Sequence, residues 1–343
     1  MSSYRSGRTD PLPGRKAAVE VQFNWIFIVI AGAVILSIFA AIVLKQKTVS
    51  EAASRATLLN VLSAIAAGSE AASGVMNVLE LPEASIEFEC NLIRIGAQSQ
   101  QFQQMMLFAP SVARTSPLLV QTKEWSIPYR ITNVVYFSTP KIRYILVGSS
   151  PLAKAINKSL PAALNVESYP ALPTSLRIQN ADHTRVVFAG ASPQFPAPLS
   201  KIDDDKMSAL AITGDGSGGT ISFYRKSETR WDLVKTYPYL RQEMLLGAVL
   251  TDDPGQYACI ATNMFRKVDL VTDIYQRRAA ALAETPSLAR CQSLYTDAQQ
   301  QFSVIRGAAS GFNEGSVQQA SQALSSLEIT NTQLQRQSCP LLY

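Results

Sequence analysis

The sequence predicts an α/β fold class. An N-terminal transmembrane helix and helical stalk precede a mixed Rossmann-like sheet domain and a C-terminal helical hairpin. Three observations predict this organisation: an uncharged apolar run over residues 23–44, strand patterns around one helical segment over 127–225, and helical periodicity from residue 257 onward. The order of strand, helix and strand favours a mostly parallel sheet.

The apolar run from Phe23 to Leu44 contains no charged residue. A helix of about 20 apolar residues matches the ~30 Å hydrocarbon core of a bilayer. Trp25 lies near the upstream end, and Lys45 and Lys47 follow the downstream end, so these three residues are the expected interfacial anchor. The alternatives are a buried core helix and a cleaved secretory signal, whose apolar region is usually about 7–15 residues long.

Residues 1–22 are expected to be a polar cytoplasmic tail, and residues 45–81 a helical stalk. Apolar residues recur in the stalk at helical spacing until Pro82 stops the run, namely Leu58, Val61, Leu62 and Ile65. The alternative is a separate helix packed on the domain that follows.

Residues 82–251 are expected to form the α/β domain. Residues 127–137 and 142–147 are rich in β-branched and aromatic residues, which is typical of strands. Ser150 and Pro151 then begin a helix over 152–160 as N-cap and first helical residue. Further strands are expected over 164–169, 185–189, 209–213 and 220–225, and the last two form a hairpin around a glycine-rich turn.

Residues 252–343 are expected to be helical. One apolar stripe runs from Tyr257 to Leu282, Pro286 ends that helix, and a second helix follows over 291–305. Residues 317–334 repeat apolar side chains every three or four residues, which is typical of a helix packed on its own domain or of a short coiled-coil seam.

The charge distribution favours an exported domain. The chain has 343 residues, of which 47% are hydrophobic, and a formal net charge of +5. For a chain of this length, that net charge is too small to indicate nucleic-acid binding. Four basic residues precede the apolar run, and three follow it closely: Arg5, Arg8, Arg15 and Lys16 before it, and Lys45, Lys47 and Arg55 after it. The positive-inside rule therefore favours a cytoplasmic N-terminus, a single pass through the cell membrane and a C-terminal domain outside.

The cysteines are Cys90, Cys259, Cys291 and Cys339, and none belongs to a CxxC pair. Dispersed cysteines without metal-ligand spacing favour two disulfides in an oxidising exterior; the alternative is four buried thiols in the cytoplasm. Four cysteines allow three pairings. A Cys90–Cys339 bond would fasten the chain end to the base of the domain, so we expect that bond and, with it, Cys259–Cys291.

Gly148, Ser149 and Ser150 are a candidate anion site, because main-chain N–H groups at the start of a helix attract anions. Ordinary capping of the helix is the alternative. His183 is the one histidine and is expected to be a solvated turn residue.

The remaining motifs are expected to be structural. GDGSGG at 214–219 is similar to the GDSGG loop of serine proteases, but it has an extra glycine and fits a hairpin turn. Asp203, Asp204 and Asp205 lack the spacing of a calcium loop. Asp252-Asp253 is expected to begin a helix, and Asn157-Lys158-Ser159 is a glycosylation sequon.

Two resemblances concern the N-terminus. Arg15-Lys16, Ala17 and Glu20 before an apolar helix resemble the start of type IV pilin-like proteins. That resemblance implies cleavage before the helix and assembly by helix packing. VQFNWIFIVIAGAVIL at 21–36, together with Cys339-Pro340 and Tyr343, is similar to uncharacterised single-pass membrane proteins of small-genome archaea, which implies the same topology.

These observations predict a membrane-anchored extracytoplasmic protein of the cell envelope with a structural or interaction role. No catalytic residue, cofactor or metal is expected. The expected partners are the lipid bilayer and a protein at the cell surface, with no nucleic acid. The alternatives are a pilin-like filament subunit and a ligand-binding or enzymatic module, which an open cleft near Gly148 would favour.

Overall fold

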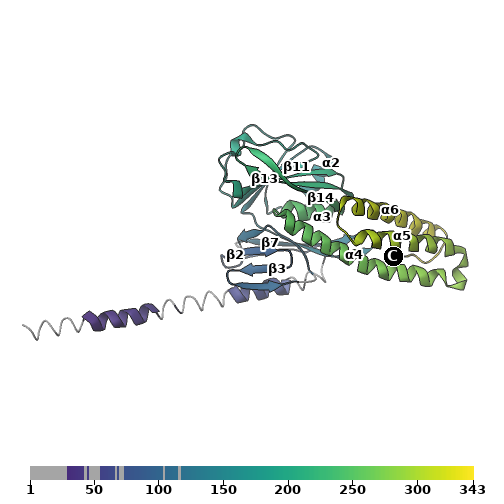
Figure 1. Cartoon of the computed structure of the whole chain (residues 1–343), viewed down its shortest axis with the longest axis horizontal. Coiled ribbons are helices and arrows are strands. Elements are labelled where there is room, and N and C mark those ends of the chain that lie inside the picture. Colours follow the sequence, from purple (N-terminus) through teal and green to yellow (C-terminus); the bar gives the residue numbers. More distant parts are fainter. Residues whose placement is uncertain are drawn as a thin grey trace, which may run out of the picture. The chain divides into compact units, whose positions relative to one another are not determined.

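The computed structural model describes residues 29–41, 45, 55–65, 68, 73–102, 105–114 and 117–343. The chain divides into two compact units, Met1–Ala56 and Thr57–Tyr343. We call the second unit the head. The described part of the head has a mixed α/β fold with three sheets (Figure 1).

In the first unit, residues 29–41 are helical and most of their side chains are exposed. Across the described ranges, no helix combines the length and the apolar character needed to cross a membrane. Residues 1–28, 42–44 and 46–54 lie outside the described residues, and with them Trp25 and Lys47. The transmembrane helix over 23–44 and its anchor residues therefore stay predictions.

Two four-stranded sheets begin the head. The first has the order β1-β7-β8-β5, formed by Met76–Leu79, Leu118–Ser126, Arg130–Ser138 and Met106–Phe108. The second has the order β4-β3-β2-β6, formed by Gln98–Gln101, Leu92–Ile95, Ser85–Glu89 and Val112–Arg114. Alternate residues of both sheets point into one shared apolar core, among them Ile86, Phe88, Val120 and Phe137.

The predicted stalk is wrong at its C-terminal end. Residues 57–65 are helical, but Leu58, Leu59 and Leu62 are buried in the core of the two sheets, so this apolar stripe packs on the head. Gly74 has a φ of 77°, and Met76–Leu79 then pairs antiparallel with β7. Hydrogen bonding to a neighbouring strand outweighs the local helical propensity there.

The largest sheet has six strands in the order β10-β9-β11-β12-β13-β14. They are Asn165–Tyr169, Ile142–Val147, His183–Ala189, Met207–Gly214, Gly218–Ser227 and Arg230–Leu240. The first four are parallel and the last two antiparallel, so the predicted mixed sheet is confirmed. Helix α2, Pro151–Ser159, follows β9, and the Ser150 side chain caps it by accepting from the Ala153 N–H.

Each face of this sheet has its own core. One face packs with α2 and with α3, Arg241–Leu250, in the main core of the head. The other face packs with residues from the segments between strands, such as Leu176 in a loop and Leu199 in a short 3-10 helix over Ala197–Leu199. Helix α3 is buried from Met244 to its end at Leu250. Its last turn lies near the amino ends of β11 and β12.

The C-terminal region has three long helices rather than the predicted hairpin. Helices α4, α5 and α6 are Pro254–Ala283, Gln292–Ala309 and Glu314–Arg336, and they lie side by side (Figure 1). Asn313 and Ser316 form a capping box that begins α6 after a short break. The helical periodicity expected over 317–334 corresponds to α6, so the C-terminal region contains one helix more than a hairpin.

The two disulfides join Cys90 to Cys259, with Cα atoms 5.7 Å apart, and Cys291 to Cys339, with Cα atoms 6.4 Å apart. Two disulfides were expected, but the expected Cys90–Cys339 and Cys259–Cys291 pairing is wrong. Helix α6 runs back along α5 after a short loop, and this places its end beside the start of α5. Cys339 therefore meets Cys291.

Candidate functional site

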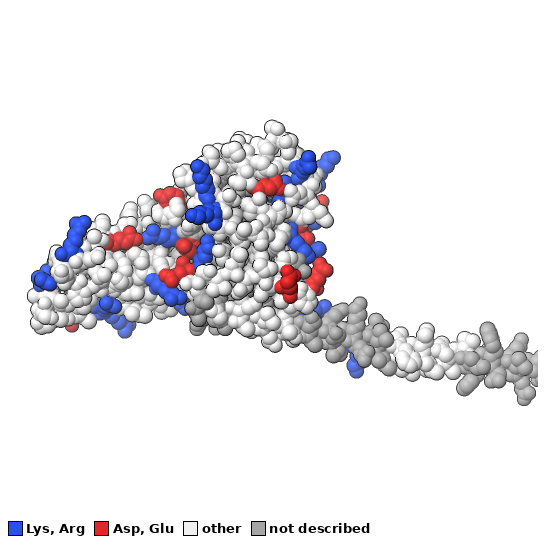
Figure 2. Space-filling view, turned by 180° about the vertical axis from the view of Figure 1, so that it is seen from behind, with Lys and Arg blue, Asp and Glu red and all other residues white. Residues whose placement is uncertain are grey.

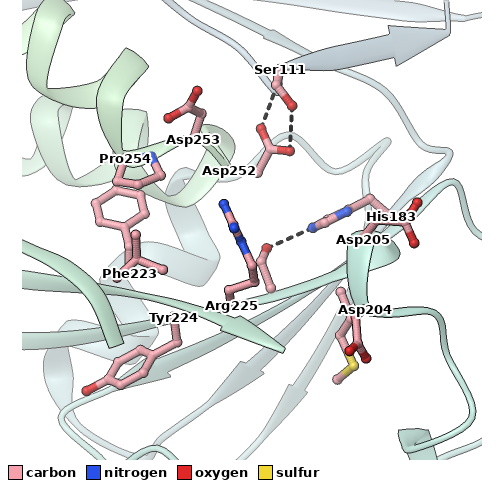
Figure 3. A pocket seen from close by; sticks show the side chains of 13 residues that line it. Ser111, His183, Asp204, Asp205, Phe223, Tyr224, Arg225, Asp252, Asp253 and Pro254 are labelled. Atoms are coloured by element: carbon pink, nitrogen blue, oxygen red, sulfur yellow. Dashed lines mark hydrogen bonds between the residues drawn. The ribbon is translucent and has the colours of Figure 1, made fainter. Parts of the chain in front are cut away.

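A cavity of about 470 Å³ opens where the parallel strands β11 and β12 begin (Figure 3). Its walls also include the later part of β13, the residue before β6, and the junction of α3 with α4. With Val234 of β14, six separate segments of the head thus converge on one space, at the amino ends of the parallel strands.

A polar row crosses the sheet at this end. It consists of Tyr144, Arg185, Ser208 and Arg225, which are directly paired positions on β9, β11, β12 and β13. Directly paired residues of adjacent strands project from the same face, and so does His183, two residues before Arg185. Further along the strands the same face is apolar and belongs to the main core.

Arg185 holds the polar row to the last turn of α3. Its side chain is buried, with a relative exposure of 1%. Nη1 donates to the Ser208 hydroxyl at 2.9 Å, and Nη2 donates to the carbonyl oxygens of Ala248 at 2.8 Å and Thr251 at 2.5 Å. Burial lowers the pKa of Arg185 to about 10, so the guanidinium stays charged at neutral pH. It donates hydrogen bonds to carbonyl groups that have no partner within the helix because they lie at its C-terminal end.

His183 lies against Ser208, with 2.7 Å between Nε2 and Oγ. The Asp205 main chain also hydrogen-bonds the ring and raises its pKa, as expected when a carbonyl accepts from a ring N–H. Because Nε2 faces Ser208, that proton belongs on Nδ1 and leaves Nε2 as an acceptor. The prediction of a solvated turn residue is therefore wrong.

The pKa of His183 is lowered overall. Burial is the largest cause and the charge of Arg185 adds to it, while the charge of Asp252 opposes it. The imidazole is therefore neutral at neutral pH.

Acidic residues from the junction of α3 with α4 form the opposite wall. Asp252 accepts from the Ser111 N–H at 2.6 Å and from the Ser111 hydroxyl at 2.8 Å (Figure 3). Asp253 caps α4 by accepting from the N–H groups of Gly255 and Gln256, so the predicted helix start is confirmed. Asp252 instead joins the helix junction to the strand region before β6.

The three consecutive aspartates bind different partners. Asp203 pairs with Lys206 at 2.6 Å, and Asp204 pairs with Lys226. In the described ranges, no group of three or more acidic, histidine or cysteine side chains is arranged to hold a metal ion.

Arg225 points into the cavity toward Asp252 (Figure 3). It forms no ion pair with any residue that the structure describes, and its side chain is exposed. The cavity therefore combines an unpaired guanidinium with a neutral imidazole and a serine hydroxyl. These are groups that can bind an oxygen-bearing ligand or act on it.

Gly148, Ser149 and Ser150 lie at the opposite end of the sheet, after β9. The Gly148 N–H donates to the Tyr169 carbonyl at 2.9 Å, and the Ser150 hydroxyl donates to the Ala189 carbonyl at 3.1 Å. A Cβ on Gly148 would lie 2.4 Å from that same carbonyl oxygen, so β9 and β11 approach closely here. The chain's own groups use these donors, and the anion site stays a prediction.

The GDGSGG motif is the predicted hairpin turn between β12 and β13. Asp215 accepts from the Ser217 N–H and hydroxyl and from the Gly218 N–H, which fixes the turn. Asn157 of the sequon lies near the end of α2 and is exposed.

Sequence reasoning missed Arg185, Ser208, Arg225 and Asp252. The sequence does contain a signal for Arg185. The segment His183–Ala189 is apolar from Val186 on, and the alternation of side chains along a strand puts Arg185 on the same face as Val187. A charged residue on a buried face needs partners, which marks it as part of a polar site. Ser208 and Arg225 become visible only through the strand register.

Comparison with protein-family models, with curated proteins and with solved structures gives no match to this chain.

Proposed function

We propose that this chain is a membrane-anchored protein whose head lies outside the cytoplasm and acts by binding a protein partner at the cell surface. The observation that carries the proposal is the state of the cysteines: all four form disulfides. Structural disulfides persist in oxidising compartments and are rare in the cytosol.

Both disulfides join parts of the head that no short segment connects. Cys90–Cys259 joins the turn after β2 to α4 across 169 residues, and Cys291–Cys339 joins the chain end to the helices across 48 residues. In the chain-entropy model such loops stabilise the fold by about 5 and about 4 kcal/mol. Stabilisation of this size suits a domain exposed outside the cell.

The anchor in this proposal is the apolar run 23–44. Its length and lack of charge match a bilayer, and basic residues before it favour a cytoplasmic N-terminus. The lipid bilayer is then the first partner of the chain.

A stripe on α4 supports a binding role for the head. Leu270 and Ile274 are 65% and 66% exposed although they are apolar. Arg266 and Arg277 are exposed on the same side of the helix, four residues before and three residues after this pair. On the face of the head seen in Figure 2, basic side chains also gather toward the end of the helical bundle. We propose that this stripe contacts a partner with apolar and acidic side chains.

The binding proposal is tested by cross-linking the full chain in its native membranes. The Leu270→Glu and Ile274→Glu double variant should lose the cross-linked partner because it places two charges in an apolar contact. Ile329→Glu, on α6 and 61% exposed, is the matched control and should keep it. Retention of the partner by the double variant would contradict the proposed surface.

The compartment is tested on the same protein. Cells are lysed in an alkylating reagent, and mass spectrometry counts the alkylated cysteines. The proposal predicts none, whereas four alkylated thiols would place the head in a reducing compartment.

A further inference from the structure

We propose that Ser208 is a nucleophile that the cavity presents to a small ester, with His183 as its general base and Arg225 as the group that binds the developing oxyanion. This activity goes beyond the proposed binding function and does not depend on it.

The direction of the hydrogen bonds carries the inference. A guanidinium has donors only, so Ser208 Oγ must accept from Arg185 Nη1 at 2.9 Å. The Ser208 proton is then available for His183 Nε2, 2.7 Å away. A serine that gives its proton to a neutral imidazole, whose other nitrogen is held by a third group, has the arrangement of an activated nucleophile. Here that third group is the Asp205 main chain.

The surrounding charges favour the reaction. Arg185 is buried beside Ser208 and stabilises negative charge on its oxygen. Burial lowers the pKa of His183, so the base is unprotonated at neutral pH, and the charge of Asp252 stabilises the imidazolium that forms after proton transfer.

Arg225 supplies the third component. It is the direct partner of Ser208 on the neighbouring strand, and its guanidinium points into the cavity (Figure 3). Because it has no ion-pair partner among the described residues, its donors are available to an incoming carbonyl oxygen.

The reaction balances without a cofactor. Ser208 Oγ attacks the ester carbonyl carbon while its proton passes to His183 Nε2, and the carbonyl oxygen becomes an oxyanion beside Arg225. The carbon–oxygen bond to the leaving alcohol then breaks, and the alcohol takes the proton from His183. Water, activated by the same imidazole, hydrolyses the acyl-serine, which releases the acid and restores the hydroxyl.

The cavity also restricts the substrate. Its volume of about 470 Å³ suits a small molecule. Four aspartates line it, at positions 204, 205, 252 and 253, against the one cationic side chain of Arg225. The expected substrates are therefore uncharged or cationic esters of short acids, and anionic esters should be poor substrates.

The test uses the full chain in a mild detergent and a fluorophosphonate probe, which reacts with activated serines. The expected result is one adduct, mapped by mass spectrometry to Ser208. His183→Gln should slow adduct formation by about 100-fold or more, because general base catalysis typically contributes that factor. Arg225→Gln should also slow it, whereas Ser222→Ala should leave it unchanged because Ser222 is half-buried on the opposite face of β13 from Arg225.

A purely structural role for Ser208 makes different predictions. Folding of each variant is checked by its melting temperature. The absence of an adduct in the folded wild-type chain would overturn the proposal, and so would an equal rate in folded His183→Gln. Ser208→Cys gives a second readout: iodoacetamide should alkylate it faster when His183 is present than in the Ser208→Cys, His183→Gln double variant, and equal rates would contradict the proposal.

Discussion

Arg185 on β11 donates a hydrogen bond to the Thr251 carbonyl oxygen that follows α3, 66 residues later in the chain. Together with its bonds to Ala248 and Ser208, this contact fixes the end of α3 over the first residues of the parallel strands. Asp252 and Asp253 lie between the end of α3 and the start of α4, and both line the cavity at this end of the strands.

Replacing Arg185 should therefore destabilise the head. Arg185→Met keeps most of the side-chain volume but leaves two buried carbonyls and the Ser208 hydroxyl without their donor. We expect the free energy of unfolding to fall by about 3 kcal/mol or more, since each buried unpaired group costs about 1–3 kcal/mol. Denaturant unfolding followed by the fluorescence of the buried Trp125 measures it. Arg230→Met, whose side chain is 75% exposed, is the control and should change stability by less than about 0.5 kcal/mol.

The disulfide at the chain end gives a second prediction. Cys291→Ser with Cys339→Ser should lower the free energy of unfolding by about 4 kcal/mol in the chain-entropy model. Limited proteolysis should then cleave after residue 336, where α6 ends, before any other site in the head. If the C-terminal peptide is released no faster than from the wild type, the tether has no such role.

Glycines in two helices should respond in opposite directions to alanine. A Cβ on Gly247 of α3 would lie 2.5 Å from the Phe108 ring, whereas nothing lies within 4 Å of a Cβ on Gly307 of α5. Gly307→Ala should stabilise the head by up to about 1 kcal/mol through helix propensity. Gly247→Ala should destabilise it by about 1–3 kcal/mol because overpacking outweighs that gain. Melting temperatures compare the two variants, and stabilisation by Gly247→Ala would show that the Phe108 ring can move away from the added methyl group.

The single histidine allows a direct pH measurement. The pKa of His183 is lowered from its ordinary 6.5, with burial as the first cause; the groups facing the ring are Asp252 and Asp205, with Arg185 and Ser208 on the sheet. The pKa of His183 is lower in the folded chain than in the unfolded chain, so the unfolded chain binds a proton more readily. The contribution of the neutral His183 ring to the free energy of unfolding is therefore complete above pH 6.5 and is lost as the pH falls below it. The imidazole NMR signal should titrate with a midpoint below 6.5.

His183→Gln should remove the part of the stability loss that begins below pH 6.5. A midpoint at or above 6.5 for the wild type would show that the ring is solvated, as the sequence alone predicts.

The parts of the fold that local patterns control could be predicted. Ile142–Val147, the Ser150 cap and the hairpin around Asp215 depend on short-range periodicity and turn chemistry, and the structure has all of them. The pairing of Cys339 with Cys291 depends on helix packing. Local periodicity predicts helices over 291–305 and 317–334, but it does not show that α6 runs back along α5 and so brings Cys339 to Cys291.

The candidate site was harder to predict because strand register builds it. Ser208 and Arg225 lie 17 positions apart in the sequence and are neighbours only through the β12–β13 pairing. His183 looked solvated because its sequence neighbours Asn180 and Asp182 are polar, whereas its structural neighbours come from β12 and the junction of α3 with α4. Asp252 could be recognised as part of a helix start, but its contact with Ser111 joins residues 141 positions apart.

Labelling of lysines on intact cells tests the central claim, an anchored chain with the head outside. A membrane-impermeant amine reagent is added to intact cells, and mass spectrometry maps the labelled lysines. Lys158 and Lys235 are exposed on the head, while Lys16 precedes the apolar run. The account predicts label on Lys158 and Lys235 in intact cells and on Lys16 only after lysis. Label on Lys16 in intact cells, or head lysines that react only after lysis, would contradict it.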